Sequence, residues 1–313
     1  MTNLAIAANG LRKSYGDKVV LNGIDLAVPQ GTVFALLGPN GAGKTTAVQI
    51  LSTLLGADGG TAVVAGFDLA RQPDAVRGAI GVTGQYSAVD KLLTGEENLL
   101  LMADLHHLSR RDGKRKAAEL LERFDLVEAA RKTASTYSGG MQRRLDLAMT
   151  LVGDPRVIFL DEPTTGLDPR SRRAMWGIVR GLVAGGVTIF LTTQYLEEAD
   201  QLADRIALLD HGKLIAEGTA EELKRLIPGG HIELKFANAH LLEAASRLVG
   251  AGVADLETLA LQVPSDGSVR ATRELLTLLD QHSIDVAEMS VHTPDLDDVF
   301  LTLTGQQKEE ATR

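Results

Sequence analysis

Short apolar runs alternate with amphipathic stretches along the first two thirds of the chain. Residues 18–38 mix alternating and continuous β-branched runs, broken by Asn-Gly and Pro-Gln-Gly, and predict antiparallel strands that lead into a buried strand. The runs RVIFLDEP and VTIFLTT, at 156–163 and 187–193, are continuous, and each follows a helical segment. This pattern is typical of strands in a mostly parallel sheet, so we expect an α/β fold.

A helical pattern separates the phosphate-loop region from these later strands. Thr94 and Glu97 have the spacing of a capping box, in which each side chain bonds to the backbone of the other residue. A largely apolar helix is expected over 98–108, and a second helix over 114–124. We therefore expect a helical subdomain over about 86–152.

The pattern of apolar and polar residues changes after residue 219, where the first domain is expected to end. Strand-like runs alternate there with amphipathic helical segments, which predicts a small α+β domain over 220–313. The strand-like runs are 231–238, 259–266 and 284–292, and the helical segments are 240–250 and 271–282.

Composition narrows the range of partners. Lys and Arg number 32 against 41 Asp and Glu, and the formal net charge of −9 argues against a nucleic acid held through its phosphates. The chain has no cysteine, which excludes disulfides and thiolate metal sites. The N-terminus does not resemble a signal peptide, and no window approaches the roughly 18 to 20 apolar residues of a membrane helix. We therefore expect a cytoplasmic chain whose membrane role requires a separate spanning partner.

A glycine-rich stretch, GPNGAGKTT, follows the apolar run VFALL and opens a helix. Its spacing and context are those of a phosphate-binding loop, in which glycines let successive backbone amides surround phosphate oxygens at a helix start. Lys44 is expected to contact the β and γ phosphates, and Thr45 a Mg²⁺ ion. The candidate nucleotide-binding residues of this loop are Gly38, Pro39, Asn40, Gly41, Ala42, Gly43, Lys44, Thr45 and Thr46.

Two acidic residues, Asp161 and Glu162, follow a buried strand. Open α/β sheets bind ligands at the carboxyl ends of their strands. Asp161 is suited to hold Mg²⁺ through water, and Glu162 to orient or deprotonate the attacking water. Adjacent acids after a strand can also simply cap a turn, but their combination with the phosphate loop favours the catalytic interpretation.

A third element, YSGGM, presents Ser138, Gly139 and Gly140 before a helix expected to begin near Met141. A hydroxyl and free amides at a helix start can bind an anion, although on its own this arrangement is more often a simple N-cap.

Taken in order, the motifs SYG, GPNGAGKTT, VTGQYS, YSGGM, IFLDEP and GLDP resemble the ATP-binding-cassette (ABC) family over about the first 220 residues. The resemblance implies a P-loop ABC ATPase core with an antiparallel β subdomain and a helical subdomain, which uses ATP and Mg²⁺. In this family the signature serine, here Ser138, completes the ATP site of a second subunit. The resemblance therefore implies a dimer.

The resemblance also assigns roles to three further residues. Tyr15 is the expected adenine-stacking aromatic, although an exposed strand aromatic would look the same in sequence. Gln85 is expected to touch Mg²⁺ or water and to report nucleotide state to a membrane subunit; the alternative is a solvated loop amide. Asp168 is expected at the dimer contact and also as the N-cap before Pro169.

The sequence departs from the family pattern at three positions. Tyr137 and Met141 stand where Leu and Gln are usual, and Gln194 stands where most members have a histidine. Glutamine keeps a hydrogen-bond donor and acceptor but does not titrate, so we interpret Gln194 as a catalytic sensor of the γ-phosphate. A strand-end amide that satisfies a turn is the alternative.

Two later stretches, LTTQYLEEADQLADRI and DLDDVFLTLTG, are similar to the daunorubicin-resistance-type export ATPases. This similarity implies an ATP-binding and ATP-hydrolysing subunit that couples dimer closure to export of a drug-like or amphipathic molecule. The transport pathway itself is formed by a separate permease. A homodimer peripheral to the cytoplasmic face of the membrane is expected, with 220–313 as an assembly or regulatory domain. The alternatives are a soluble ABC ATPase acting on a ribosome or nucleic acid, and an importer ATPase.

Overall fold

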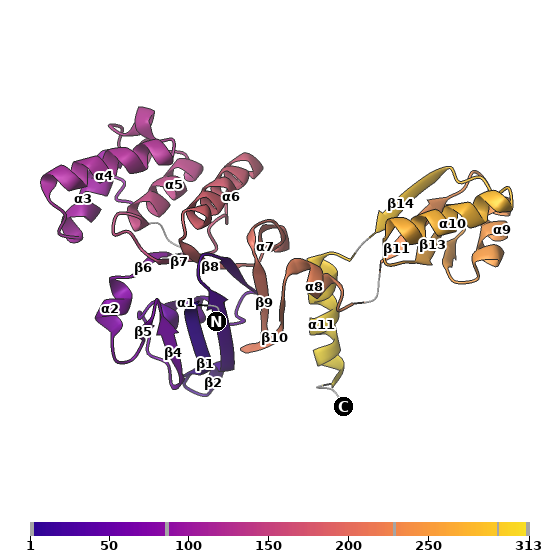
Figure 1. The fold of residues 1–313 in the computed structure, drawn as a ribbon, viewed down its shortest axis with the longest axis horizontal. Helices are drawn as coiled ribbons and strands as arrows, with labels where there is room; N and C mark the ends of the chain where they lie inside the picture. The colour runs from indigo at the N-terminus through magenta and orange to yellow at the C-terminus, as the bar shows by residue number, and fades with distance from the viewer. Residues whose placement is uncertain (1–2, 85–87, 228–229, 293, 311–313) are drawn as a thin grey trace. The chain divides into compact units, whose positions relative to one another are not determined.

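A computed structural model describes residues 3–84, 88–227, 230–292 and 294–310 (Figure 1). The chain divides into two compact units, Met1–Ala220 and Glu221–Arg313. Within the described residues, no helix is both long and apolar enough to cross a bilayer.

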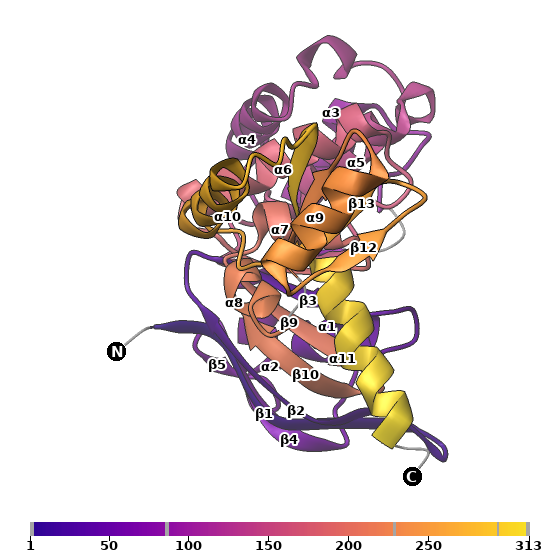
Figure 2. The same ribbon diagram turned by 90° about the vertical axis from the view of Figure 1, so that its right-hand side faces the viewer.

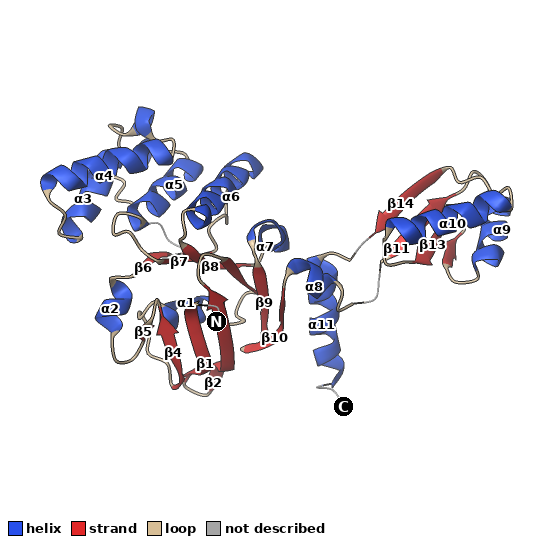
Figure 3. Ribbon diagram, in the orientation of Figure 1, coloured by secondary structure: helices blue, strands red, loops and turns tan. Residues whose placement is uncertain are grey.

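The first unit contains two sheets (Figure 3). A four-stranded antiparallel sheet has the order β2-β1-β4-β5, with β1 Leu4–Tyr15, β2 Lys18–Pro29, β4 Gly59–Val64 and β5 Phe67–Asp68. A six-stranded sheet has the order β10-β9-β3-β8-β7-β6, and only β10 runs antiparallel to its neighbour. Its strands are β3 Val33–Leu37, β6 Ile80–Thr83, β7 Val157–Asp161, β8 Thr188–Thr193, β9 Arg205–Asp210 and β10 Lys213–Gly218. The prediction of a mostly parallel sheet is therefore confirmed.

Four helices of the first unit, α3, α4, α5 and α6, begin at residues whose side chains cap them. Thr94 and Glu97 form the predicted capping box at the start of α3, and Ser109 caps α4. In Figure 1, α3, α4 and α5 gather into one helical layer, with α6 beside α5. The helices are α1 Lys44–Leu51, α2 Pro73–Arg77, α3 Gly95–Leu105, α4 Arg110–Arg123, α5 Gly139–Thr150, α6 Pro169–Ala184 and α7 Leu196–Leu202, with short 3₁₀ turns at Val127–Ala129 and Ala134–Thr136.

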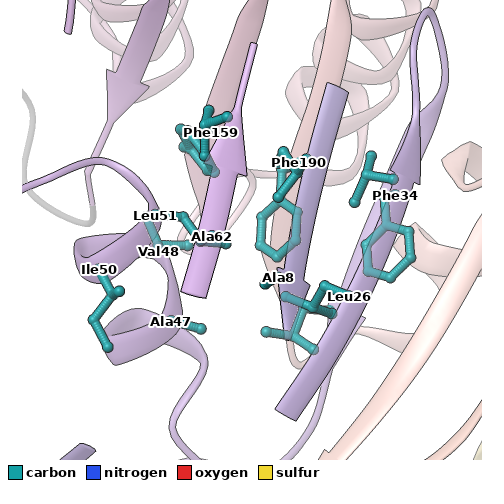
Figure 4. Packing of buried hydrophobic residues seen from close by; sticks show 14 of the residues in the cluster. Ala8, Leu26, Phe34, Ala47, Val48, Ile50, Leu51, Ala62, Phe159 and Phe190 are labelled. Atoms are coloured by element: carbon teal, nitrogen blue, oxygen red, sulfur yellow. The ribbon is translucent and has the colours of Figure 1, made fainter. Parts of the chain in front are cut away.

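The core of this unit lies where α1 packs against strands of both sheets. Phe190 is central, with its ring centroid 5.6 Å from that of Phe34 and 5.6 Å from that of Phe159. All three rings are fully buried, and Figure 4 shows them beside Leu26 and the α1 residue Val48. Because a close-packed core resists displacement, it fixes the ends of β3, β7 and β8 relative to α1.

The second unit is built on a four-stranded antiparallel sheet of order β12-β13-β11-β14. Apolar residues of β11 and β13, including Leu234 and Leu261, pack with Leu242 of α9 and Leu279 of α10 in a separate core. These two helices cover one face of the sheet (Figure 2). The elements are α8 Ala220–Lys224, β11 His231–Lys235, α9 Ala239–Val249, β12 Val253–Asp255, β13 Ala260–Pro264, α10 Val269–Gln281, β14 Glu288–His292 and α11 Leu296–Glu310.

Candidate active site

The glycine-rich loop joins β3 to α1, and two of its glycines cannot be replaced without a clash. A Cβ at Gly38 would lie 2.2 Å from the carbonyl oxygen of Leu209. Gly43 has φ of 112°, and a Cβ there would lie 2.8 Å from the carbonyl oxygen of Val20. As the N-cap of α1, Gly43 also leaves the first amides of this helix without a side-chain cap. This tight turn and open helix start suit the binding of phosphate.

A pocket of about 300 Å³ lies against this loop. Tyr15, at the end of β1, lines the pocket and is 50% exposed. One face of its ring can therefore stack on a nucleotide base. Glu162 lies on the wall as well. The remaining lining residues are Lys18, Val20, Asn40, Gly41, Gly43, Lys44, Thr45 and Thr46.

Lys44 is almost fully buried beside the loop. Its Nζ donates to the carbonyl oxygens of Gly38, at 2.7 Å, and Pro39, at 3.2 Å, and lies 3.7 Å from Oε1 of Glu162. Burial lowers the pKa of Lys44, while the charges of Glu162 and Asp161 oppose that shift. The ammonium group is therefore held at the loop by weak neutral acceptors and one carboxylate, which an incoming phosphate can replace.

Asp161 connects the end of β7 to the neighbouring segments. Its Oδ2 accepts a hydrogen bond of 3.0 Å from the hydroxyl of Thr45, and its Oδ1 accepts one from the hydroxyl of Thr192. A hydroxyl and a carboxylate are hard oxygen ligands of the kind that Mg²⁺ prefers, so these residues fit the predicted ion.

Glu162 follows in a backbone conformation that is unusual for a residue with a side chain. Its φ is 50°, and its amide donates to the carbonyl oxygen of Thr192 at 3.0 Å and to the hydroxyl of the same residue at 3.2 Å. The hydroxyl of Thr165 donates to Oε2 at 3.2 Å. Such left-handed residues cluster at active sites because surrounding contacts hold them there. The contacts with Thr192 and Thr165 hold Glu162 so that its carboxylate faces the pocket.

Arg143 of α5 is a residue that the sequence reasoning missed. Its guanidinium donates to the carbonyl oxygens of Gly84 and Pro163, both at 2.9 Å, and to that of Asp161 at 3.2 Å. It also lies 3.2 Å from Oδ2 of the buried Asp146. The planar guanidinium thus ties α5 to the ends of β6 and β7. The only signal in the sequence is a pair of arginines on an otherwise half-apolar helix.

The signature residues lie at the start of α5, next to the start of α6. Ser138 is the N-cap and accepts the amide of Met141 at 3.3 Å, so the helix begins at Gly139, two residues earlier than expected. A Cβ at Gly140 would lie 2.7 Å from the hydroxyl oxygen of Ser171 in α6. The helix reaches back to Gly139 because the serine hydroxyl replaces the missing intrahelical partner.

Asp168 caps the neighbouring helix, as predicted. Its Oδ1 accepts the amides of Arg170 and Ser171, both at 3.0 Å, and its Oδ2 accepts the Ser171 hydroxyl at 2.6 Å. These bonds, the Ser171 hydroxyl first, lower the pKa of Asp168. Neither Ser138 nor Asp168 lines the 300 Å³ pocket.

The unusual Tyr137 has a structural explanation. Its hydroxyl donates to the carbonyl oxygen of Ala129 at 2.7 Å, and the residue is buried. A Cβ at Gly95 would lie 2.2 Å from that hydroxyl oxygen. Tyr137 therefore occupies space that only glycine at the start of α3 leaves open, and the two residues must change together.

Of the two candidate glutamines, Gln85 and Gln194, the structure describes only Gln194. Gln85 lies outside the described residues. Gln194 directly follows β8 and is partly exposed, and its side chain makes no hydrogen bond to another residue in the described part of the chain. It is not among the residues that line the pocket.

Comparison with known proteins agrees with this geometry. A family model described as ABC transporter matches residues 21–165. The chain is 51% identical to the daunorubicin resistance ATP-binding protein DrrA2 of Streptomyces coeruleorubidus, over 99% of this chain and 98% of that protein. It is 45% identical to the doxorubicin resistance ATP-binding protein DrrA of Mycobacterium tuberculosis, over 99% and 96%. It is also 38% identical to the Nod factor export ATP-binding protein I of Rhizobium sp., over 99% and 100%.

Solved structures are similar as well. An ATP-binding subunit of an ABC transporter superposes with a TM-score of 0.64 at 28% identity, covering 72% of this chain and 93% of that one. A nucleotide-free ATP-binding cassette from an ABC transporter gives 0.65 at 26% identity, covering 71% and 94%. The chain belongs to the ABC transporter family. It is an ATP-binding, ATP-hydrolysing subunit of the exporter type, and the predicted family and activity are confirmed.

Proposed function

We propose that this subunit hydrolyses ATP with Glu162 as general base and with Mg²⁺ held by Thr45 and Asp161. A dimer of such subunits closes and opens with each cycle of hydrolysis, and a separate permease uses this movement to export an amphipathic molecule. The observation that carries the assignment is the meeting of two segments, the start of α1 and the end of β7: the Thr45 hydroxyl lies 3.0 Å from Asp161, and Lys44 lies 3.7 Å from Glu162. Loop, cation, metal ligands and base are thus assembled at one edge of the six-stranded sheet.

Each residue has one task in this proposal. Lys44 and the open amides of α1 bind the β and γ phosphates and offset their charge. Glu162 accepts a proton from the attacking water, and the hydroxyl of Thr165 keeps its carboxylate in place. A bound Mg²⁺ neutralises charge on the phosphate oxygens. Gln194 senses the γ-phosphate from the end of β8.

A second copy of the chain completes the site. Ser138 and Gly139 expose a hydroxyl and helix amides at the start of α5, and nothing in the 300 Å³ pocket comes from that region. Since these groups are chemically suited to a phosphate, we assign them to the nucleotide held by the partner. Asp168, rigidly capped beside them, contributes to the same dimer contact.

The permease is expected to dock at a second, mainly apolar groove of about 310 Å³. Its lining residues include Leu54, Val82, Ala88, Met102 and Met149. Such a groove fits a short amphipathic segment from a cytoplasmic loop of a membrane protein, which would hold this subunit at the cytoplasmic face of the membrane.

A chain of contacts leads from this groove to the base. The amide of Ala88 donates to Oδ1 of Asp146 at 3.0 Å, and Oδ2 of Asp146 lies 3.2 Å from Arg143. Arg143 in turn holds the backbone carbonyls of Asp161 and, at 3.5 Å, Glu162. A segment that moves Ala88 would therefore shift the carboxylate indirectly. Gln85 precedes Ala88 and is assigned here to report nucleotide state.

We propose that the exported molecule resembles daunorubicin, because several relatives are daunorubicin or doxorubicin resistance proteins. The test is accumulation of fluorescent daunorubicin in cells that lack this chain. Restoring the wild-type chain should lower accumulation, while Glu162→Gln at equal abundance should not. Equal accumulation with and without the wild-type chain, in cells where the purified chain hydrolyses ATP, would exclude this class of cargo but not the ATPase.

A further inference from the structure

The sheet of the second unit carries a cluster that the ATPase site does not use. His231 and Glu233 alternate along β11 with the buried Ile232 and Leu234, so they lie on the face opposite the core. His292 ends β14, the strand that pairs with β11.

The register of the sheet brings these side chains together. His231 pairs with His292 across the two strands, and the two rings stack with centroids 4.7 Å apart at an interplanar angle of 14°. Glu233, two residues along the same face, completes the group. One potential ligand atom from each of the three residues lies within 4.8 Å of the others.

Neighbouring side chains hold the cluster in orientation. The hydroxyl of Ser290 lies 3.2 Å from Nε2 of His292, and the amide of Gln262 donates to Oε2 of Glu233 at 3.3 Å. The nearby Lys235 is bound to Glu288 at 3.0 Å. Partners of this kind fix the rings and carboxylates of metal sites in known proteins.

We propose that His231, Glu233 and His292 bind one divalent transition-metal ion, and that Zn²⁺ fits the donor set best. Two imidazoles and one carboxylate are a common three-residue ligand set for Zn²⁺, with water in the fourth position. Zn–N and Zn–O bonds of about 2.0 to 2.2 Å place tetrahedral ligand atoms about 3.4 Å apart. Since the three atoms lie within 4.8 Å of one another, the side chains must close by at most roughly 1.4 Å. Changes of rotamer can supply this movement, since His231 and Glu233 are only partly buried and His292 is exposed.

The site is independent of nucleotide chemistry, because its residues lie in the second unit and none of them lines the ATP pocket. Its expected role is to link β14 to β11 and thereby to stabilise this unit. A ligand that binds only the folded state raises the unfolding midpoint.

The test is titration of the full-length, untagged chain with ZnCl₂ in excess Mg²⁺, followed by calorimetry. We expect one Zn²⁺ per chain, and at least about 10-fold weaker binding in His231→Ala, His292→Ala and Glu233→Gln. The matched control is His240→Ala/His282→Ala, which removes two exposed histidines of the same unit and should bind as the wild type does.

Thermal unfolding gives a second readout. Zn²⁺ should raise the midpoint of the wild type and of the control, and should leave His231→Ala/His292→Ala unchanged. Because Glu233→Gln keeps the shape of the side chain, it serves if the histidine variants fail to fold. Wild-type binding of Zn²⁺ by Glu233→Gln and by the double variant, or no binding by the wild type, would overturn the proposal.

Discussion

Two clusters in the first unit contain most of the predicted site residues, and they differ in how complete they are. At the pocket, two separate segments meet: Lys44 and Thr45 at the start of α1 approach Glu162 and Asp161 at the end of β7 within 3.7 Å. At the starts of α5 and α6, and counting partners among the described residues alone, the side chains of Ser138 and Asp168 bond only to the first turns of their own helices.

This difference indicates where the missing half of the chemistry comes from. The pocket has a cation, metal ligands and a base, but nothing from the signature helix lines it. The helix starts have hydroxyl and amide donors, but the carboxylate beside them, Asp168, is occupied by the hydrogen bonds of its cap. In the proposed function, two copies placed head to tail would supply each cluster with what it lacks.

The largest effect is expected at the base. Glu162→Gln removes the proton acceptor but keeps its shape, so steady-state ATP turnover should fall by about 10² to 10⁴ while ATP still binds. The control is Glu197→Gln, which changes an exposed glutamate of α7 whose contact to Arg172 is 3.5 Å long. Unchanged turnover in Glu162→Gln would remove this residue from its role.

Gln194 should matter somewhat less. Loss of one positioned transition-state donor costs on the order of 10² to 10³ in rate, so Gln194→Ala should lose turnover much more than ATP affinity. Gln194→His should stay active and gain a titration at about pH 6 to 7. Turnover and affinity measured across that range decide the matter, because near-wild-type turnover in the alanine variant would leave Gln194 a structural residue.

Arg143 connects the two clusters, because it lies on α5 and binds the backbone of the segment that carries Asp161. A substitution of Arg143 should therefore disturb the pocket from the signature helix. Lysine cannot reproduce the planar fork that holds three backbone carbonyls and Asp146. Arg143→Lys should lower turnover by about 10- to 10²-fold through misplacement of Glu162, with ATP affinity retained. The adjacent Arg144→Lys, which faces Asp125, should have little effect. Equal effects of the two variants would contradict a positioning role.

The smallest effect concerns stability. Burial raises the pKa of Glu198, against the opposing influence of Thr193, Thr164, Trp176 and Arg172. A raised pKa means that the carboxyl stabilises the fold fully below its unfolded pKa and loses this contribution as pH rises through the folded value. Relative to Glu198→Gln, the wild type should therefore lose stability as pH increases from about 4.5.

Unfolding midpoints of the two forms across this pH range measure that effect. A difference of 1 kcal/mol corresponds to about 2 to 4 °C for a domain of 150 to 250 residues. A difference that does not change with pH would show that Glu198 is not held in an environment that disfavours its charge.

Much of the site could be predicted because its signals are local. The spacing of the glycine loop, the acids after an apolar run and the N-caps at Thr94 and Asp168 each depend on a few consecutive residues. The alternation and apolar runs likewise predicted the mixed sheets.

The rest depends on contacts between distant segments. The bonds of Arg143 to Gly84 and Pro163, and the space that Gly95 leaves for Tyr137, appear only once the helices are packed. The pairing of His231 with His292 depends on strand register, which the sequence pattern of each strand does not specify.

The most direct test of the two-copy account is a mixing experiment with Ser138→Arg and Lys44→Ala. Ser138→Arg places a bulky cation at the start of α5 and should abolish hydrolysis, yet the isolated subunit should still bind ATP because its loop is intact. Lys44→Ala should weaken ATP binding itself. Mixed heterodimers combine one intact loop with one intact signature, so the mixture should regain activity, limited to one working site per heterodimer. Loss of ATP binding by monomeric, folded Ser138→Arg, or no activity in the mixture despite heterodimer formation, would contradict the account.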